Sequence, residues 1–470
     1  MPSTKLILPI ILTLTVIRGL IYISLFPPWF APDEPLHFEA IRLIGQEKLQ
    51  PTMEVYQHTP IHPELIESFE NLRVWQLGFK TLPSFPADSD SQSDLTFMQY
   101  YPAHWVNTVI MAGEYPLLYH NILAPISSLS QPLTLLLQVY ILRLISLLFT
   151  VTTVLLGWFF AAAIFPSSII PRMAVTTFLV FLPMHMHINT AVNTDVAATF
   201  LASLFFVLVA RLLLHRYSRP YLLSGAIFLV AFLAGFVNPT TLFVIPTALV
   251  AGFVLISRRL RWPLRLTAIG VLLAIPLTLV GAVVVFQIAN FGRGLATQQV
   301  SLSGLDFDVF VPGQHQVGLY IHTVRWGFLS FWGLFGWTNF HVPFGWIRVL
   351  WFLCMVMVAG FAWFMLRQVR GIDSRLDPLQ QDVLLVLSAA VVFGLISMYA
   401  PIIATQSDRW GPPGRYFLPA LLPLTLMLFI GFREWFPTCL DRWVLPVWVT
   451  IWVTFDTAVI SLILIPAIYG

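Results

Sequence analysis

Long apolar stretches dominate the chain, and their lengths predict membrane-spanning helices. About eleven stretches are long enough to cross a bilayer or nearly so. They cover residues 6–26, 133–163, 173–188, 193–213, 221–237, 240–256, 266–288, 346–366, 382–403, 415–432 and 443–467. The first stretch has no small-residue cleavage site, so we interpret it as a retained span rather than a signal peptide. The pattern predicts an all-α polytopic membrane protein with a single membrane domain over residues 1–470.

Composition supports this class and excludes others. Hydrophobic residues make up 58% of the 470 residues and charged residues only 10%, which is too apolar for a soluble core. The net charge is only +3 and the basic residues are scattered through short loops, so we expect no nucleic-acid partner. The two cysteines, Cys354 and Cys439, lie apart and offer neither a disulfide framework nor a thiolate metal site.

Arginines in the short loops predict the orientation of the chain. They recur between alternate apolar stretches, as at Arg172, Arg258, Arg370 and Arg433, and such loops stay in the cytoplasm. We therefore expect a plasma (inner) membrane protein with a cytoplasmic N-terminus. The long loops 27–132 and 289–345 then lie on the extracytoplasmic side, together with ten of the eleven histidines. Titratable groups gathered on one membrane face favour an active site there.

The first long loop is predicted to have its own structure, because about one hundred residues exceed what a connector needs. Residues 35–48 place apolar side chains on one helical stripe and Glu39, Arg42, Gln46 and Glu47 on the other. This pattern predicts a helix lying in the membrane interface.

The candidate chemistry begins with an acidic pair just beyond the first span. Asp33 and Glu34 lie in the segment Pro32-Asp33-Glu34-Pro35-Leu36-His37. Adjacent carboxylates at a membrane surface can supply a general base or bind a divalent cation, and their oxygens suit Mg or Mn. The alternative is a helix N-cap, because Asp followed by Glu opens helices well.

Further candidates fall on the same predicted face. Arg415 and Tyr416 follow the turn Gly411-Pro412-Pro413-Gly414, and an arginine there can receive a phosphate or extend to lipid headgroups. Asn193 and Asp195 either line a polar site or cap a helix. Tyr115 and Tyr119 either order the loop or anchor it at the interface. The second long loop holds Asp306, Asp308, His315 and His322, for which solvation is favoured over a metal role.

Together these motifs resemble the GT-C superfamily of integral-membrane glycosyltransferases. The acidic pair is similar to that superfamily's signature after the first span, and Tyr115-Pro116-Leu117-Leu118-Tyr119 resembles its Pro-Pro-Leu-Tyr-Tyr segment. Arg143 matches an arginine common in the next span, and Asn193-Thr194-Asp195 resembles its polar Asn-Asp element. The segment Gly414-Arg415-Tyr416-Phe417-Leu418-Pro419 is similar to the bacterial membrane family DUF2142, which is placed in the same clan.

The resemblance implies a GT-C-like bundle that transfers a sugar from a polyprenyl-phosphate donor to a glycan, lipid or protein acceptor in cell-envelope synthesis. Asp33 would act as the base, and Glu34 would orient it or bind a divalent cation. Arg415, with His37 and Tyr416, would bind the donor phosphate. Tyr115, Tyr119, Arg143, Asn193 and Asp195 would support the site. The alternatives are a transporter or flippase for a lipid-linked or anionic substrate, and an envelope-assembly scaffold with a degenerate site.

Overall fold

The computed structural model describes residues 4–79, 95–100, 117–214, 220–294, 314–372, 375–405 and 413–470. Within these ranges, nine helical segments are long and apolar enough to cross a membrane. They are Leu6–Leu25, Leu135–Ile164, Thr194–Leu213, Pro239–Arg259, Leu264–Val285, Phe344–Val369, Pro378–Ala404, Gly414–Glu434 and Thr438–Tyr469. Two shorter apolar helices, Ile170–Phe181 and Tyr221–Val237, lie among them. The chain is therefore an all-α polytopic membrane protein, whereas the predicted count of about eleven spans stays a prediction.

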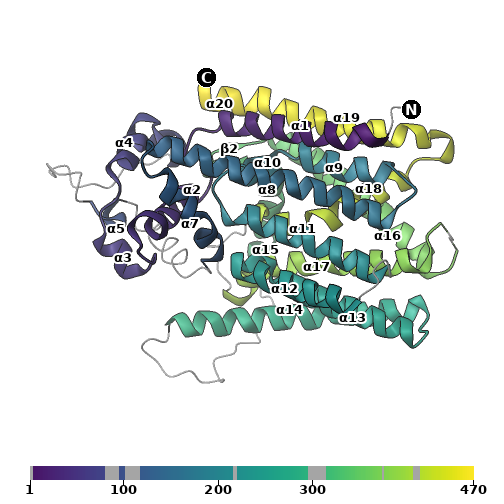
Figure 1. Ribbon diagram of the computed structural model, residues 1–470. Coiled ribbons are helices and arrows are strands. Elements are labelled where there is room, and N and C mark those ends of the chain that lie inside the picture. Colours follow the sequence, from purple (N-terminus) through teal and green to yellow (C-terminus); the bar gives the residue numbers. More distant parts are fainter. Residues whose placement is uncertain are drawn as a thin grey trace.

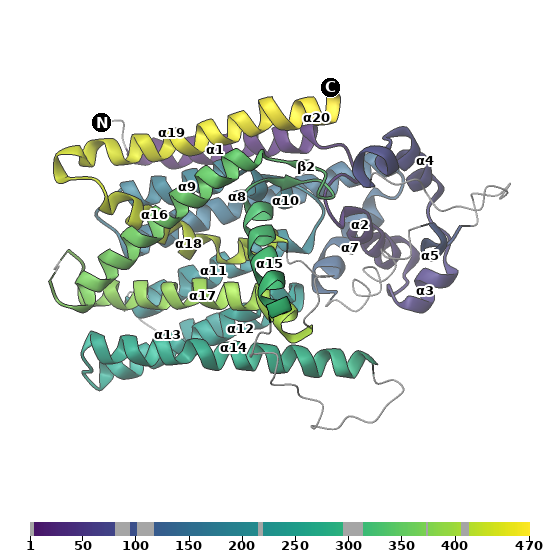
Figure 2. The same cartoon turned by 180° about the vertical axis from the view of Figure 1, so that it is seen from behind.

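The long helices run side by side in one bundle (Figure 1). Helices α1 and α19 lie together at one edge of the bundle, and α12 to α14 form the opposite edge (Figures 1 and 2). In chain order the bundle comprises α1 (Thr4–Leu25), α8 (Leu135–Ile164), α9 (Ile170–Phe181), α10 (Pro183–Asn189), α11 (Thr194–Leu213), α12 (Pro220–Val237), η4 (Pro239–Phe243), α13 (Val244–Arg259), α14 (Leu264–Gly294), α15 (Gln314–Gly333), α16 (Phe344–Val369), α17 (Pro378–Thr405), η8 (Gly414–Ala420), α18 (Leu421–Glu434), η9 (Thr438–Leu440), α19 (Asp441–Val459), η10 (Ile460–Leu464) and α20 (Ile465–Tyr469).

A pair of opposite charges joins the first and last spans. Arg18 of α1 forms an ion pair with Asp456 of α19, which is fully buried and also accepts a hydrogen bond from the hydroxyl of Tyr22 at 2.8 Å. Burying a charge in an apolar medium is costly unless it meets a partner. This pair therefore fixes the C-terminal helix against the first one.

Short helices of the first long loop gather at one end of the bundle (Figures 1 and 2). They are α2 (Glu34–Arg42), the π-helix η1 (Leu43–Glu47), α3 (Met53–His58), α4 (Pro63–Asn71), η2 (Val74–Phe79), α5 (Phe97–Tyr100) and α7 (Leu118–Ser130). Helices α2 and η1 cover most of the predicted stretch 35–48, but only part of its polar stripe is exposed: Glu39 and Arg42 are buried, Gln46 is half-buried and Glu47 is exposed. Every residue of α2 is buried. The charges of Glu39 and Arg42 can be buried because Arg42 donates two hydrogen bonds, of 2.6 and 2.9 Å, to the Glu39 carboxylate.

A two-stranded antiparallel hairpin closes the same end. Strand β1 (Leu334–Phe335) directly follows α15 and pairs with β2 (Phe340–His341), so that Leu334 faces His341 and Phe335 faces Phe340. The backbone N–H of Gly336 in its turn donates to Nε2 of His187 at 3.2 Å. The hairpin is thereby tied to α10.

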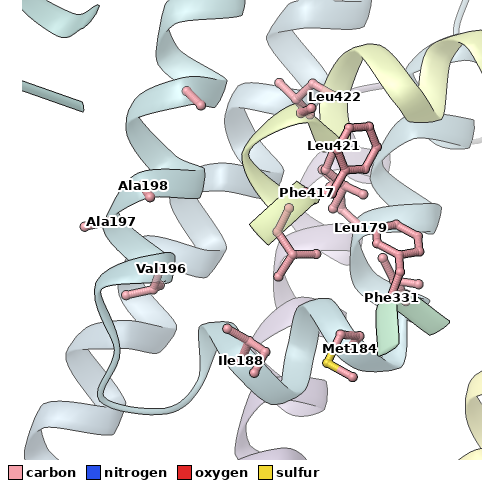
Figure 3. Close-up of a cluster of buried hydrophobic side chains, with 14 of the residues drawn as sticks. Leu179, Met184, Ile188, Val196, Ala197, Ala198, Phe331, Phe417, Leu421 and Leu422 are labelled. Atoms are coloured by element: carbon pink, nitrogen blue, oxygen red, sulfur yellow. The ribbon is translucent and has the colours of Figure 1, made fainter. Parts of the chain in front are cut away.

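A buried apolar cluster supports the segment that leads into α18. Figure 3 shows side chains from η8 and α18 converging with others from α9, α10, α11 and α15. The labelled members are Leu179, Met184, Ile188, Val196, Ala197, Ala198, Phe331, Phe417, Leu421 and Leu422. Close packing of this kind holds a backbone segment in one position.

Candidate functional site

A cavity of about 440 Å³ opens between the α1–α2 connection, α10, α15, the hairpin turn and the start of η8. This volume falls in the range of roughly 300–1,000 Å³ that small-molecule sites occupy. Its walls are formed by Pro32, Asp33, Met184, Ile188, His322, Thr323, Trp326, Ser330, Leu334, Gly336, Trp337, Thr338, Pro413 and Arg415.

Two predicted site residues, Asp33 and Arg415, meet in this cavity although 382 positions separate them. One guanidinium nitrogen of Arg415 donates to a carboxylate oxygen of Asp33. The Asp33 side chain is 22% exposed and that of Arg415 is 9% exposed. The guanidinium also lies 5.5 Å from the centre of the Tyr416 ring. The cavity therefore combines an anionic and a cationic group on one wall.

Arg415 is positioned by the packing of its neighbour Gly414 against α15. The Gly414 backbone N–H donates to the hydroxyl of Ser330 at 2.5 Å. A Cβ at position 414 would lie 2.2 Å from the Phe331 nitrogen and 2.4 Å from the Gly327 oxygen, both backbone atoms. Only glycine fits such an approach, which fixes the turn that carries Arg415 on the surface of α15.

Asp33 sits at the N-cap position of α2 but does not cap it. Its backbone adopts a left-handed conformation with φ 63°, and its side chain makes no capping hydrogen bond. The backbone oxygen of Asp33 instead accepts the N–H groups of Leu36 and His37 at 3.1 and 3.0 Å. Aspartate tolerates this strained conformation better than most residues. The carboxylate is thus left free to face Arg415.

Glu34 occupies a different environment from Asp33. It is fully buried, and its two oxygens accept four hydrogen bonds. Arg143 donates from Nε at 2.8 Å and from Nη2 at 2.6 Å, while the backbone N–H groups of Trp29 and Val192 donate at 2.9 and 3.1 Å. Glu34 does not line the cavity. The geometry therefore gives Glu34 a structural role in the turn that carries Asp33, while its predicted roles, to orient Asp33 or to bind a divalent cation, stay predictions.

Arg143 completes this buried cluster by binding the end of α1. Its guanidinium donates to the backbone oxygens of Ile23, Phe26 and Pro27 at 3.2, 2.6 and 3.0 Å. A cation is favourable at a helix C-terminus, where carbonyl groups lack partners. Arg143 and Glu34 together join α8 to the α1–α2 connection.

Asp195, Asn193 and Asn238 support the site from α11 and the loop after α12. Oδ1 of Asn193 accepts the Asp195 N–H at 2.9 Å, so Asn193 caps α11, and its Nδ2 donates to the Pro32 oxygen at 3.1 Å. Asp195 accepts a hydrogen bond from Asn238 at 2.8 Å, and its other oxygen lies 3.5 Å from Nε of Arg415. Nothing in the sequence singles out Asn238, because Asn before Pro is typical of an ordinary turn.

His37 faces α7 rather than the cavity. Its Nδ1 lies 3.0 Å from Nε2 of His120, and both rings are buried. Burial, and then the nearby charge of Arg415, lowers the pKa of His37 to about 3. Burial also lowers the pKa of His120. A neutral, enclosed His37 lends no charge to a phosphate, so this part of the predicted phosphate site does not follow from the geometry.

Two of the three predicted tyrosines lie in the described ranges, in different surroundings. Tyr119 is buried and meets the His37 ring edge-on at 6.5 Å, which places it in the support of α2. Tyr416 is half-buried beside Arg415. Tyr115 lies outside the described residues, as do Asp306 and Asp308.

The two predicted cation ligands, Asp33 and Glu34, are each paired with an arginine. No group of three or more His, Cys, Asp or Glu side chains is placed to hold a metal ion in the part of the chain that the structure describes. Both oxygens of Glu34 already accept from Arg143, and Asp33 faces Arg415. The geometry of these two residues therefore adds no support for Mg or Mn binding, which stays a prediction.

The wall formed by α15 was largely missed from the sequence. His322 had been noted only as a loop residue, while Thr323 and Trp326 lie in an apolar stretch that looks like ordinary core. The structure places all three on the cavity. Their spacing of one and four residues puts them on one helical face, which is the signal that could have found them.

Fold and site together define an integral membrane protein with a charged cavity at one end of its helix bundle. No protein-family model matches the chain, and neither a curated protein nor a solved structure matches it with significance.

Proposed function

We propose that this protein is a GT-C-type glycosyltransferase that moves a sugar from a polyprenyl-phosphate carrier to a glycan, lipid or protein acceptor in the cell envelope. The observation that carries the proposal is the meeting of Asp33 and Arg415 in one cavity. Inverting transfer from a lipid phosphate needs a base for the acceptor hydroxyl and a cation for the departing phosphate. These two side chains supply both.

In the proposed reaction, Asp33 accepts the proton of the acceptor hydroxyl while that oxygen attacks the anomeric carbon. The bond from this carbon to the phosphate oxygen breaks with inversion, and Arg415 stabilises the phosphate that leaves. A second carboxylate, Asp195, lies 3.5 Å from Arg415 and keeps the guanidinium in place when the phosphate arrives.

The ion pair between Asp33 and Arg415 supports an order of events in the proposed reaction. As long as Arg415 binds Asp33, the carboxylate is stabilised as an anion and is a weaker base. A donor phosphate competes for the same guanidinium and releases Asp33. We infer that the base becomes effective only when the donor is bound.

The distribution of arginines supports an extracytoplasmic position of this cavity at the plasma membrane. At the other end of the bundle, Arg258 pairs with Asp382 at 2.6 Å, and Arg433 pairs with Asp441 at 3.0 Å. Arg-rich ends of this kind stay in the cytoplasm. The N-terminus of α1 is at that end as well (Figure 1).

The test is the release of polyprenyl phosphate from a panel of polyprenyl-phosphate sugars by purified protein in lipid, with acceptor extract added. Asp33→Asn keeps the shape of the side chain and removes the base, so we expect turnover to fall by roughly 10²–10⁴-fold. Asp441→Asn makes the same chemical change in an exposed ion pair at the far end and is the matched control.

Full turnover in Asp33→Asn would disprove the assignment of the base. Movement of a labelled lipid-linked sugar across proteoliposomes without release of polyprenyl phosphate would support the transporter alternative instead.

A further inference from the structure

Three side chains on α15 face the cavity without a partner. His322, Thr323 and Trp326 all line it, and none of them forms a hydrogen bond, ion pair or ring contact with the part of the chain that the structure describes. Thr323 is 2% exposed, Trp326 is half-buried and His322 is exposed. The Thr323 hydroxyl and the His322 imidazole are therefore available to exchange hydrogen bonds with a ligand in the cavity.

Other tryptophans near this wall are held by protein contacts. Trp332 stacks on Trp452 with ring centres 5.4 Å apart, and Nε1 of Trp337 donates to the Trp29 oxygen at 2.8 Å. Trp326 differs because neither its ring nor its indole N–H is used in this way. Its flat ring is therefore available on the cavity wall.

The three residues form one surface because of their helical spacing. Positions 322 and 326 are one turn apart, and position 323 lies beside them on the same face. One helix turn further along, Ser330 binds the Gly414 N–H at 2.5 Å. This bond connects the α15 wall to the turn that carries Arg415, so that the two walls keep a fixed separation.

The hairpin turn beside this wall is strained. Thr338, which lines the cavity, has φ 71°. This conformation is unfavourable for a β-branched residue and persists only where the surroundings enforce it. Strain of this kind collects at ligand sites, which supports a binding role for this end of the cavity.

We propose that His322, Thr323 and Trp326 form the subsite that binds the sugar ring of the donor. This inference rests on the proposed function for its ligand class. A pyranose ring has an apolar C–H face that stacks on an aromatic ring, and hydroxyl groups at its edge that exchange hydrogen bonds with hydroxyl and imidazole groups. With the ring on Trp326, Thr323 and His322 are in reach of its hydroxyl groups, and the phosphate points to Arg415.

The test measures saturation-transfer NMR signals from free monosaccharides on the full-length protein in lipid nanodiscs free of sugar-based detergent. The panel contains glucose, galactose, mannose, rhamnose, arabinose and N-acetylglucosamine. We expect a signal from at least one sugar. We expect its Kd to rise about tenfold in Trp326→Leu, which removes the stacking ring, and severalfold in the isosteric Thr323→Val.

Two further variants serve as references. Trp443→Leu removes a 51% exposed tryptophan on α19, outside the cavity, and should leave the signal unchanged. Arg415→Gln should keep the monosaccharide signal, because a free sugar carries no phosphate, but should weaken binding of polyprenyl phosphate. Melting curves of all variants establish that they fold.

The absence of a signal from every sugar on the wild-type protein would overturn the proposal. An unchanged signal in both Trp326→Leu and Thr323→Val would do the same. Either result is compatible with normal release of polyprenyl phosphate, so the glycosyltransferase proposal would survive it. A sugar signal that depends on Trp326, in a protein that releases no polyprenyl phosphate, would instead support the sugar subsite and argue against the transfer reaction.

Discussion

The two adjacent carboxylates make the sharpest stability prediction, because replacing each carboxylate by a carboxamide should have effects of very different size at neighbouring positions. We expect Glu34→Gln to destabilise the fold strongly and Asp33→Asn to change its stability little. Both variants replace a carboxylate by a carboxamide of nearly the same shape. Any difference between them therefore reports the environment of the charge.

The expected magnitude for Glu34→Gln follows from its four hydrogen bonds. If the amide nitrogen replaces Oε1, it faces the donors Nε of Arg143 and the Val192 N–H; if it replaces Oε2, it faces Nη2 of Arg143 and the Trp29 N–H. In either orientation the amide NH₂ group of the glutamine faces two hydrogen-bond donors, and Arg143 loses its counter-ion. Breaking a buried ion pair from one side costs about 3–5 kcal/mol. Since Arg143 keeps its three backbone carbonyl partners, we expect about 3 kcal/mol, with about 1 kcal/mol more for the backbone N–H left unpaired.

The expected effect of Asp33→Asn is smaller. The Asp33 side chain is 22% exposed, and Arg415 retains Asp195 as an anionic neighbour. A partly solvated pair of this kind contributes up to about 1 kcal/mol. The free energies of unfolding of the two variants should therefore differ by about 3 kcal/mol.

The measurement is SDS-induced unfolding in mixed micelles, followed by circular dichroism, for the wild type and both single variants. The single variant Arg143→Met and the double variant Glu34→Gln/Arg143→Met complete a cycle, and the double variant should be less destabilised than the sum of its two single variants because no unpaired buried charge remains. Equal destabilisation by the two carboxamide substitutions, or a stable Glu34→Gln protein with reduced turnover, would refute the structural role of Glu34.

Two further predictions test the packing around the site. Gly414→Ala brings a methyl group against backbone atoms of α15, so we expect a loss of about 1–3 kcal/mol in the free energy of unfolding and slower release of polyprenyl phosphate; a melting curve like that of the wild type would contradict this. Acid should weaken the fold through His37 and His120. The unfolded state gains a proton near pH 6.5, whereas the pKa of His37 in the folded state is lowered to about 3. Between these two pH values the unfolded state binds more protons than the folded state. The free energy of unfolding should therefore fall by up to about 1.4 kcal/mol for each pH unit of acidification and for each histidine. Unfolding titrations from pH 7 to 5 should show a smaller slope in His37→Gln.

The sequence predicted the class of fold well for a physical reason. In the apolar core of a membrane, backbone N–H and C=O groups can form hydrogen bonds only with other backbone groups of the protein. The length and composition of an apolar stretch are therefore enough to indicate a helix. The first long loop was harder, because pattern alone does not show what covers a helix. Glu39 and Arg42 looked like a solvated face, yet they neutralise each other inside the protein.

Individual site residues were recognisable, but their partners were not. Asp33 and Arg415 each had a chemical rationale, whereas their contact depends on how helices 382 positions apart are packed. Trp326 and Thr323 shared only a weak signal, their common helical face with His322, because one tryptophan and one threonine in an apolar helix are ordinary. Only the cavity distinguishes them from residues that face lipid or core.

The separation of Asp33 and Glu34 into different roles follows from the conformation of their connection. Trp29 and Asp33 both have positive φ values, 73° and 63°, so the chain reverses sharply between α1 and α2. Glu34 binds the Trp29 N–H across this turn, and Arg143 binds both Glu34 and the end of α1. The buried ion pair thereby closes the turn on one side and presents Asp33 on the other. Two adjacent carboxylates in such a turn can therefore have different roles. Glu34 stabilises the strained backbone conformation, and this conformation places the Asp33 carboxylate at the cavity.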